Sequence, residues 1–373
     1  MSNQQVRTAA SRRVFLGGAA GAGAVTLGFP LIATAQSPIV LRFQSTWPAK
    51  DIFHEYASDY VRRVNEMAAG RLRLDLLPAG AVVGALQMQD AVNSGALDGG
   101  HGVCAYWYGK NKAYSLFGTA PAFGWEPEDL LSWFYYGGGE DLYKEMSQGI
   151  LKLGVVGWLT GPMPTQPLGW FKKPVTTVAE IQKLKYRTVG LAADLMKEMG
   201  VSVTIMGGGD IVPAMDRGVL DAAEFNNPSS DRALGFPDVA KTYMLQSFHQ
   251  RMECFEIIFN QKKFEGLPKD LQAILRYAAE AASSDMSWKW RKRYPEDLDN
   301  LYKDGVKTYI TSKEILQGQL DAWNRVIDRL SAADAFFKKV VDSQKAWAHR
   351  IVEFRAKWDA PNEMAYRHFF GKK

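Results

Sequence analysis

Short segments with strand periodicity alternate with amphipathic helical segments along most of this chain, and this alternation limits the possible folds more than any other feature. Strand patterns lie at residues 39–43, 71–76 and 99–103, with helical patterns over 53–67 and 86–94 between them. A helix that carries the chain back across a sheet places the next strand parallel to the last. The pattern therefore predicts an α/β fold with a largely parallel sheet.

A second α/β unit follows a strand pattern at residues 151–159. Thr177 and Glu180 form a capping box, in which a hydroxyl and a carboxylate satisfy backbone donors at the start of a helix. The further strands predicted in this unit lie at residues 185–188, 201–206 and 219–225. Glycines after the intervening helical patterns mark where those helices end.

From residue 268 onward the chain reads as mostly helical. Large apolar side chains recur there at helical spacing, namely Phe336, Val340, Trp347, Ile351, Phe354 and Trp358. We interpret them as a packing stripe, with pairing of two copies through these helices as the alternative. The predicted division is lobe I from residues 36–159 with about 256–300, lobe II from 160–255, and a helical C-terminal region from 301–373.

Residues 1–35 have the pattern of an export signal. Arg12 and Arg13 precede a stretch rich in glycine and alanine, and small residues at 33–35 offer a signal-peptidase site. Twin arginines before a weakly hydrophobic segment are typical of twin-arginine (Tat) export, whereas a stretch this poor in large apolar residues is a weak membrane anchor. We predict a Tat signal peptide that is cleaved near Ala35, which places the mature chain in the periplasm.

Charge and cysteine content narrow the function classes further. The formal net charge is +5, and it falls to about +2 without the three leader arginines, so no polybasic patch indicates nucleic-acid binding. The two cysteines, Cys104 and Cys254, can form a disulfide in an exported protein or remain buried free thiols. The sequence leaves both possibilities open.

The motifs of the common enzyme classes are missing from the sequence. The five histidines show no metal-ligand spacing, and neither a nucleophile elbow nor a C-x-x-C motif occurs. The glycines at 207–209 lack the flanking residues of a phosphate-binding loop, and we interpret them as a turn between a strand and a helix.

Arg187 is the polar residue whose position most suggests a ligand. It lies at the end of a predicted strand, where open α/β sheets bind their ligands. Its planar guanidinium can donate two parallel hydrogen bonds to a carboxylate. A structural salt bridge is the alternative, and these features alone favour neither.

Several motifs together resemble one family. They are Gly169-Trp170-Phe171-Lys172-Lys173-Pro174, Lys185-Tyr186-Arg187, the run from Gly209-Asp210-Ile211 to Ala222-Ala223-Glu224, Ser45-Thr46-Trp47-Pro48, and Tyr106-Trp107-Tyr108-Gly109-Lys110. Over nearly the whole mature chain the sequence resembles the DctP-type solute receptors of tripartite ATP-independent periplasmic (TRAP) transporters. The last two motifs resemble the branch that binds 2-oxo and 2-hydroxy monocarboxylates.

The resemblance implies a periplasmic binding protein fold, in which two α/β lobes are joined by hinge strands and a long interdomain helix and close over one anion. It implies that Arg187 grips the ligand carboxylate, that Gln166 reaches the ligand, and that Trp47 and Tyr106 wall the pocket. A TRAP membrane permease is the implied partner. The candidate ligand-binding residues are Trp47, Tyr106, Gln166, Arg187, Glu224, Phe225, Asn226 and Gln250.

The resemblance also implies a bridging Na⁺ or Ca²⁺ held by Gln166, Glu224, the carbonyl of Phe225 and Gln250. Two residues depart from the family pattern, because Phe225 replaces a tryptophan and Gln250 replaces a glutamate. An amide oxygen can still ligate either cation, but it supplies less charge. Arg251 disfavours a cation further unless Glu253 offsets it.

We therefore expect a receptor, with no enzyme activity, that captures a small organic acid by domain closure and delivers it to a TRAP permease. An exported enzyme acting on a similar acid, with Glu224, His249 and Gln250 near its cleft, is the rival hypothesis. A ligand-presenting subunit for a sensor kinase is a third.

Overall fold

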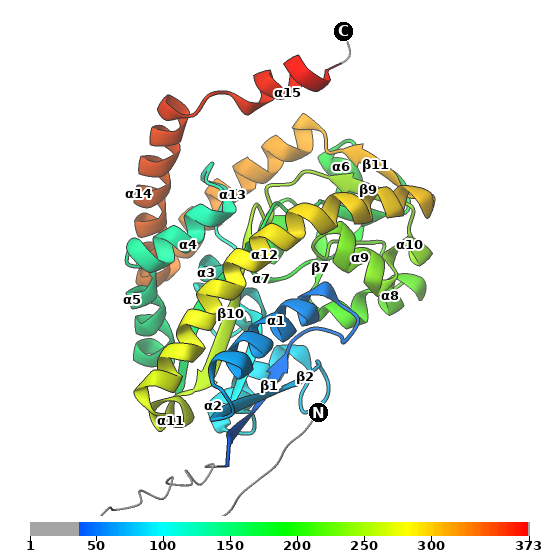
Figure 1. The fold of residues 1–373 in the computed structure, drawn as a ribbon. Helices are drawn as coiled ribbons and strands as arrows, with labels where there is room; N and C mark the ends of the chain where they lie inside the picture. Colours follow the sequence, from blue (N-terminus) through cyan, green and yellow to red (C-terminus); the bar gives the residue numbers. More distant parts are fainter. Residues whose placement is uncertain (1–36, 372–373) are drawn as a thin grey trace, which may run out of the picture. The chain divides into compact units, whose positions relative to one another are not determined.

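The computed structural model describes residues 37–371. The predicted signal peptide and its cleavage site lie outside this range. The described chain contains two β-sheets with helices packed around them (Figure 1). Sheet A has the strand order β2-β1-β3-β10-β4, and sheet B has the order β11-β9-β5-β8-β6-β7. The predicted α/β class is confirmed.

Sheet A is built mostly from the first third of the described chain. Its strands are β1 (Ile39–Ser45), β2 (Leu72–Leu77), β3 (Gly99–Val103), β4 (Val155–Met163) and β10 (Glu253–Asn260). β1 pairs in parallel with β2 and β3, whereas β10 runs antiparallel to both β3 and β4.

Sheet B is built from shorter strands. They are β5 (Gly169–Phe171), β6 (Lys185–Arg187), β7 (Ser202–Thr204), β8 (Ala222–Ala223), β9 (Thr242–Leu245) and β11 (Lys307–Ile310). β6 is parallel to β7 and β8, and β9 is parallel to β11, but β5 is antiparallel to both of its neighbours. β11 adds an edge strand from a segment that the sequence predicts to be mostly helical.

The expectation of a largely parallel sheet is wrong, because both sheets are mixed. Every antiparallel pairing involves β5 or β10, the strands that follow the two short passages of the chain between the sheets. A strand that enters a sheet from the other sheet does not follow a helical crossover, so its direction is not fixed by the βαβ rule. Residues 164–168 and 246–252 form the two passages.

Helices account for most of the remaining chain. The α-helices that precede β10 are α1 (Ile52–Met67), α2 (Met88–Ser94), α3 (Tyr114–Gly118), α4 (Pro127–Tyr136), α5 (Gly139–Lys144), α6 (Val178–Ile181), α7 (Gly190–Glu198), α8 (Gly208–Asp216), α9 (Pro228–Leu234) and α10 (Phe236–Val239). Those that follow are α11 (Gln261–Glu265), α12 (Lys269–Lys303), α13 (Lys313–Ala333), α14 (Ala335–Trp358) and α15 (Asn362–Phe370). Short 3₁₀ and π-helical turns are η1 (Ala85–Gln87), η2 (Cys104–Trp107) and η3 (Glu145–Ile150). The predicted capping box of Thr177 and Glu180 is present at the start of α6.

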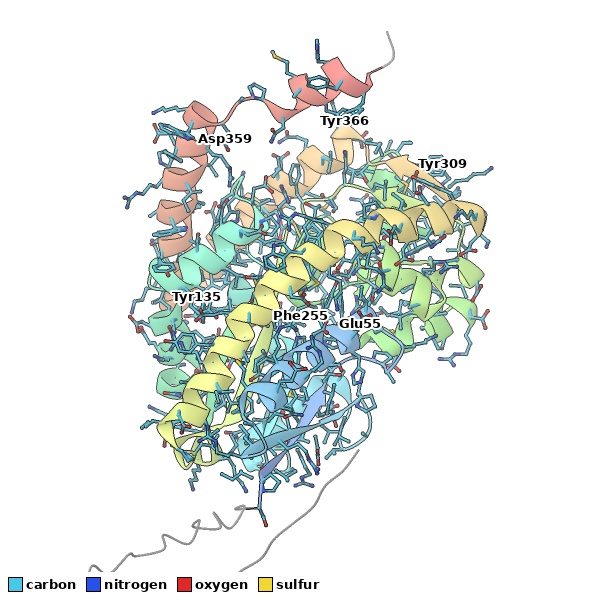
Figure 2. All side chains as sticks on the ribbon, in the orientation of Figure 1. Glu55, Tyr135, Phe255, Tyr309, Asp359 and Tyr366 are labelled. Carbon is cyan, nitrogen blue, oxygen red and sulfur yellow. The ribbon has the colours of Figure 1, made fainter. Side chains whose placement is uncertain are left out.

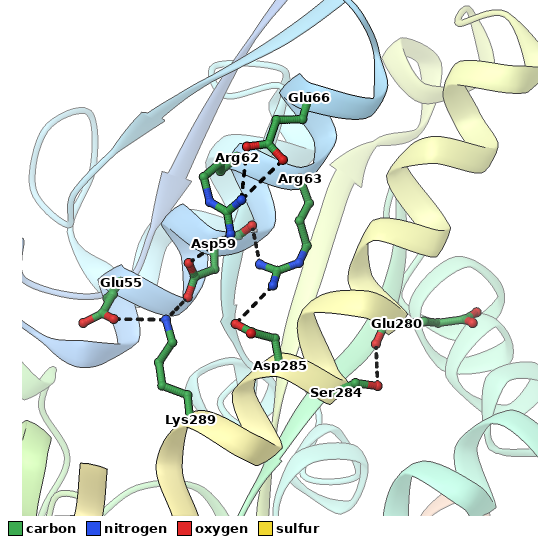
Figure 3. Close-up of polar contacts among 9 residues, drawn as sticks. All are labelled: Glu55, Asp59, Arg62, Arg63, Glu66, Glu280, Ser284, Asp285 and Lys289. Atoms are coloured by element: carbon green, nitrogen blue, oxygen red, sulfur yellow. Dashed lines mark hydrogen bonds and ion pairs between the residues drawn. The ribbon is translucent and has the colours of Figure 1, made fainter. Parts of the chain in front are cut away.

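Helix α12 packs against elements of both sheets (Figure 1). It contacts β4 and α1 on the side of sheet A, and α9 on the side of sheet B. Figure 3 shows the charged part of its contact with α1, where Lys289 reaches Glu55 and Asp59 and Arg63 pairs with Asp285 at 3.2 Å. One helix thus links the elements around sheet A to those around sheet B.

The two cysteines are both buried free thiols. They lie on neighbouring segments, since Cys104 follows β3 and Cys254 is in β10, which pairs with β3. Burial raises the pKa of each thiol well above its ordinary value. Of the two possibilities left open by the sequence, the structure has the free-thiol form.

The C-terminal stripe is only partly buried. Phe336 and Val340 pack into the core, but Phe354 and Trp358 are 58% and 75% exposed. No residue of α15 is buried, and Tyr366 in Figure 2 belongs to this helix. None of the helices within residues 37–371 combines the length and the apolar character needed to cross a bilayer.

Candidate functional site

Arg187 is the last residue of β6, and its side chain is 1% exposed. Nη1 donates to Oε1 of Glu224 at 2.9 Å and to the carbonyl oxygen of Glu224 at 3.0 Å. Nε and Nη2 both donate to the carbonyl oxygen of Met206, at 3.1 and 2.8 Å. The guanidinium is therefore held by the segments that follow β7 and β8, at the sheet edge where the sequence predicts a ligand.

Glu224, the partner of Arg187, uses only one of its two carboxylate oxygens in hydrogen bonds. Glu224 is fully buried, and its Oε2 atom has no hydrogen-bond partner. Burial raises the pKa of Glu224 to about 7 although Arg187 opposes the shift. A buried ion pair with an unpartnered oxygen is costly in a purely structural role, because each buried polar atom loses its hydration. This oxygen is thus a candidate contact for a ligand or a cation.

Gln166 and Gln250 come from the two passages between the sheets. The backbone N–H of Gln166 donates to the carbonyl oxygen of Gln250 at 3.0 Å, and both side chains are fully buried. Oε1 of Gln166 and both polar atoms of the Gln250 side chain have no partner. The hinge passages therefore bring two unpartnered amide oxygens into the interior.

Phe225 and Asn226 follow Glu224 in the same segment. The Phe225 ring lies 5.7 Å from the guanidinium carbon of Arg187, and it also packs 5.7 Å from the ring of Phe53 in α1. Gly208 allows this placement, since a Cβ atom there would lie 2.3 Å from the Phe225 ring. Asn226 donates through Nδ2 to Oε2 of Glu253 at 3.4 Å.

Trp47 and Tyr106 form one aromatic wall, with their ring centroids 5.8 Å apart. Trp47 donates its indole N–H to Nδ1 of His101 at 2.9 Å, so only its ring faces are free for contact. Burial raises the pKa of the Tyr106 hydroxyl well above its ordinary value. The two residues predicted to wall the pocket therefore pack against each other.

Glu253 is a residue of the site that the candidate set does not include. It begins β10, is 5% exposed, and accepts from Nε2 of Gln166 at 2.7 Å. Burial, with the nearby charge of Glu224, raises the pKa of Glu253 to about 8. No local motif marks this position, because its partners lie tens of residues away along the chain.

His249 does not form the acid–base arrangement that the enzyme hypothesis needs. Its Nδ1 atom is 2.5 Å from Oγ of Ser247, and its buried Nε2 atom has no partner. Burial, with Arg187 nearby, lowers the pKa of His249 to about 3. The imidazole is therefore neutral at physiological pH, with no carboxylate bonded to it.

The buried oxygen atoms fit a hard cation better than a transition metal. Within residues 37–371, no group of three or more histidine, cysteine, aspartate or glutamate side chains is arranged to hold a metal ion. The unpartnered atoms are instead Oε1 of Gln166, Oε2 of Glu224 and Oε1 of Gln250. Carboxylate and amide oxygens suit Na⁺ or Ca²⁺, to which the Phe225 carbonyl could add.

A cleft of about 390 Å³ adjoins this cluster on the side of the passages and α12. Its lining is mainly apolar and includes Pro164, Pro167, Asn226, Tyr243, Phe248 and Tyr294. Asn226 is the member of the predicted set that lines it. All eight predicted residues are at most 9% exposed, so the site is enclosed between the two sheets.

Comparisons with known proteins identify the family and the fold. The family described as bacterial extracellular solute-binding protein, family 7 (DctP), matches residues 43–334. A Nostoc protein named as a monocarboxylate 2-oxoacid-binding periplasmic protein is 30% identical over 328 residues, which are 88% of each chain.

Two crystal structures of TRAP solute-binding proteins share the fold. One, from Bordetella bronchiseptica with calcium and picolinate, has a TM-score of 0.84 at 26% identity and covers 90% of this chain and 98% of its own. The other, from Pseudoalteromonas atlantica with sodium and pyruvate, has a TM-score of 0.81 at 29% identity and covers 89% and 99%. The predicted two-lobed architecture is confirmed by this likeness. The chain belongs to the DctP family of bacterial extracellular solute-binding proteins, the receptors of TRAP transporters.

Proposed function

We propose that this protein binds a small monocarboxylate, a 2-oxo or 2-hydroxy acid or a cyclic relative, and delivers it to a TRAP permease. The observation that carries the proposal is the enclosed Arg187–Glu224 pair at the edge of sheet B. Family membership supports it, as do the picolinate and pyruvate bound by similar receptors.

Charge balance supports joint binding of the acid and a cation. Arg187 and Glu224 form a neutral pair, so a carboxylate alone would bring an uncompensated charge into a buried site. If Glu224 turns to a cation, Arg187 can offer N–H groups to the carboxylate. The cation supplies positive charge beside the ligand oxygens, and the chain supplies the residues that orient both.

We propose one lobe around each sheet, with residues 36–159 and about 256–300 in lobe I and 160–255 in lobe II. β11 (Lys307–Ile310) pairs in sheet B and so joins lobe II, and β4 and β10 keep their ends at residues 160–163 and 253–255 in sheet A. Ligand reaches the enclosed residues when the lobes separate and is sequestered when they close. The ligand shifts this equilibrium by its higher affinity for the closed form. The passages at residues 164–168 and 246–252 are the proposed hinges.

The remaining parts of the proposal concern export and assembly. The leader of residues 1–35 directs Tat export and is removed near Ala35, which N-terminal sequencing of the periplasmic protein checks. Two copies pair through α14 and α15, whose exposed aromatic residues are Phe354, Trp358, Tyr366, Phe369 and Phe370. A similar receptor crystallised as a dimer.

Calorimetry with purified mature protein tests the central proposal. We expect pyruvate, lactate or picolinate to bind in buffer with Ca²⁺ or Na⁺, and to be recovered chemically unchanged, since the proposed receptor catalyses no reaction. Arg187→Ala should weaken binding at least a hundredfold, because the buried carboxylate loses about 3 kcal/mol or more of charge-assisted hydrogen bonding.

Arg325→Ala is the matched control, because Arg325 pairs with Glu198 at 2.9 Å on the surface, outside the cluster and the passages. It should bind the acid with nearly native affinity. Equal affinities for native protein and Arg187→Ala would reject Arg187 as the anchor. Turnover of the acid would instead favour an enzyme.

A further inference from the structure

Glu253 is a buried carboxylate whose hydrogen-bond partners are all neutral. Oε2 accepts from Gln166 at 2.7 Å and from Asn226 at 3.4 Å, and Oε1 accepts from Thr119 at 3.4 Å. Three donors on one buried carboxylate, in a site with Arg187 and Glu224, make this residue part of the site rather than of the general core.

A chain of hydrogen bonds fixes the direction of each amide in this network. The backbone N–H of Ser230, at the start of α9, donates to Oδ1 of Asn227 at 2.9 Å. Nδ2 of Asn227 must then donate to Oδ1 of Asn226, also at 2.9 Å. The remaining amide group of Asn226, Nδ2, faces Glu253. A backbone N–H can only donate, so the bond from Ser230 fixes which end of each amide is oxygen and which is nitrogen.

The ionised form of Glu253, which a cation nearby favours, has only acceptors, so Gln166 turns its NH₂ group toward Oε2. This turns Oε1 of Gln166 away from Glu253, where it is buried without a partner. Oε2 of Glu224 and Oε1 of Gln250 are in the same condition. All three atoms are oxygens that a cation satisfies and a second carboxylate does not, whereas Nε2 of Gln250, also without a partner, can donate to a ligand carboxylate.

We propose that Glu253 is a positioning residue: it holds Gln166 with its carbonyl oxygen toward the site and so prepares the site for a cation beside the ligand. The inference rests on the proposed carboxylate-binding function and deepens it. A carboxylate that orients a metal-ligating side chain from behind raises affinity for the metal without touching it. Glu253 in this way adds a carboxylate behind the neutral amides of Gln166 and Gln250.

The test measures cation affinity directly. Mature protein is freed of divalent ions with EDTA, dialysed, and titrated with Ca²⁺ by calorimetry, alone and with saturating pyruvate. Glu253→Gln, which is nearly isosteric, lets Gln166 turn its amide either way. We expect about 10- to 100-fold weaker Ca²⁺ binding, the usual effect of losing such a partner. Glu253→Asp, too short to reach Gln166, should weaken binding in the same direction.

A double-variant cycle distinguishes positioning from a general loss of charge. If Glu253 acts through Gln166, then Glu253→Gln combined with Gln166→Leu should bind Ca²⁺ no more weakly than Gln166→Leu alone. Glu256→Gln is the control, because Glu256 is also buried in β10 but accepts from Trp107 and Tyr143 instead. It should keep native Ca²⁺ affinity.

Unchanged Ca²⁺ affinity in Glu253→Gln, multiplicative effects in the double variant, or no Ca²⁺ binding by native protein in either titration would overturn the inference. None of these outcomes bears on the carboxylate site itself, which is measured by pyruvate titration in EDTA with Na⁺ present. Absence of carboxylate binding under every condition would overturn the proposed function, even if Ca²⁺ bound.

Discussion

Single residues decide how the site is held together. Arg187 and Glu224 pair at the end of β6, but the pair leaves one carboxylate oxygen without a partner. Phe225 covers the guanidinium at 5.7 Å, and it can do so only because Gly208 has no side chain. A glycine at the start of α8 thus controls access of an aromatic ring to the anchor.

Gly208→Ala is expected to displace this ring. The new Cβ atom would lie 2.3 Å from the Phe225 ring, and overpacking of this kind costs about 1–3 kcal/mol. Urea unfolding should show the loss of stability, and calorimetry should show weaker binding of the acid. Gly209→Ala is the matched control, since its Cβ would meet only Pro48 at 3.4 Å. Equal behaviour of the two variants would contradict this explanation.

At the scale of elements, the C-terminal helices differ from the rest of the chain. α14 packs on the body through Phe336 and Val340, but its last turns and the whole of α15 expose large apolar side chains. Apolar surface of this kind usually marks an interaction site. In a two-fold symmetric dimer, this surface would pack against the same surface of the second copy.

Truncation after Trp358 tests pairing through these helices. Native protein should be a dimer in analytical ultracentrifugation, and the truncated protein should be a monomer with an unchanged unfolding transition, because α15 buries no residue. Trp288→Ser is the control, because Trp288 is a large aromatic residue that is 70% exposed but lies on α12, outside α14 and α15. A monomeric native protein would exclude the proposed assembly.

At the scale of the whole molecule, buried acids lie where the elements around sheet A meet those around sheet B. Asp51 caps α1 and accepts from Oγ of Ser230 in α9 at 2.5 Å. Burial raises the pKa of Asp51 from 3.8 to about 7, with Asp231 raising it further and Lys50 opposing. The folded protein therefore binds a proton at Asp51 more tightly than the unfolded chain does.

Stability should consequently fall as pH rises through this window. Between pH 4 and 7 the folded state holds more protons at Asp51, so the contribution of Asp51 to the free energy of unfolding decreases by at most about 1.4 kcal/mol per pH unit. Asp51→Asn keeps an acceptor for Ser230 and removes this contribution, whereas those of Glu224 and Glu253 remain in both proteins. Urea unfolding of both proteins at several pH values measures the difference, which should grow from pH 4 to 7 in favour of the variant. A constant difference would contradict the assignment.

The local periodicity of the sequence predicts much of the fold. The end of α2 agrees with prediction, because Gly95 takes a φ of 82° that glycine adopts most readily. The strand at residues 99–103 also agrees with prediction. The predicted strand over 219–225 is reduced to Ala222–Ala223, the only part flanked by β5 and β6. Pairing partners, which local sequence does not specify, set its length.

The sequence by itself determined the α/β class, the family and the position of Arg187 at a strand end, since each is carried by neighbouring residues along the chain. Only the tertiary structure decided the mixed strand directions, the free thiols, and which buried oxygens lack partners. Glu253 and Gln166 are 87 positions apart, and Arg187 and Glu224 are 37 apart. Such contacts arise only when the sheets and passages come together, so the hydrogen-bond balance of the site is a property of the folded molecule.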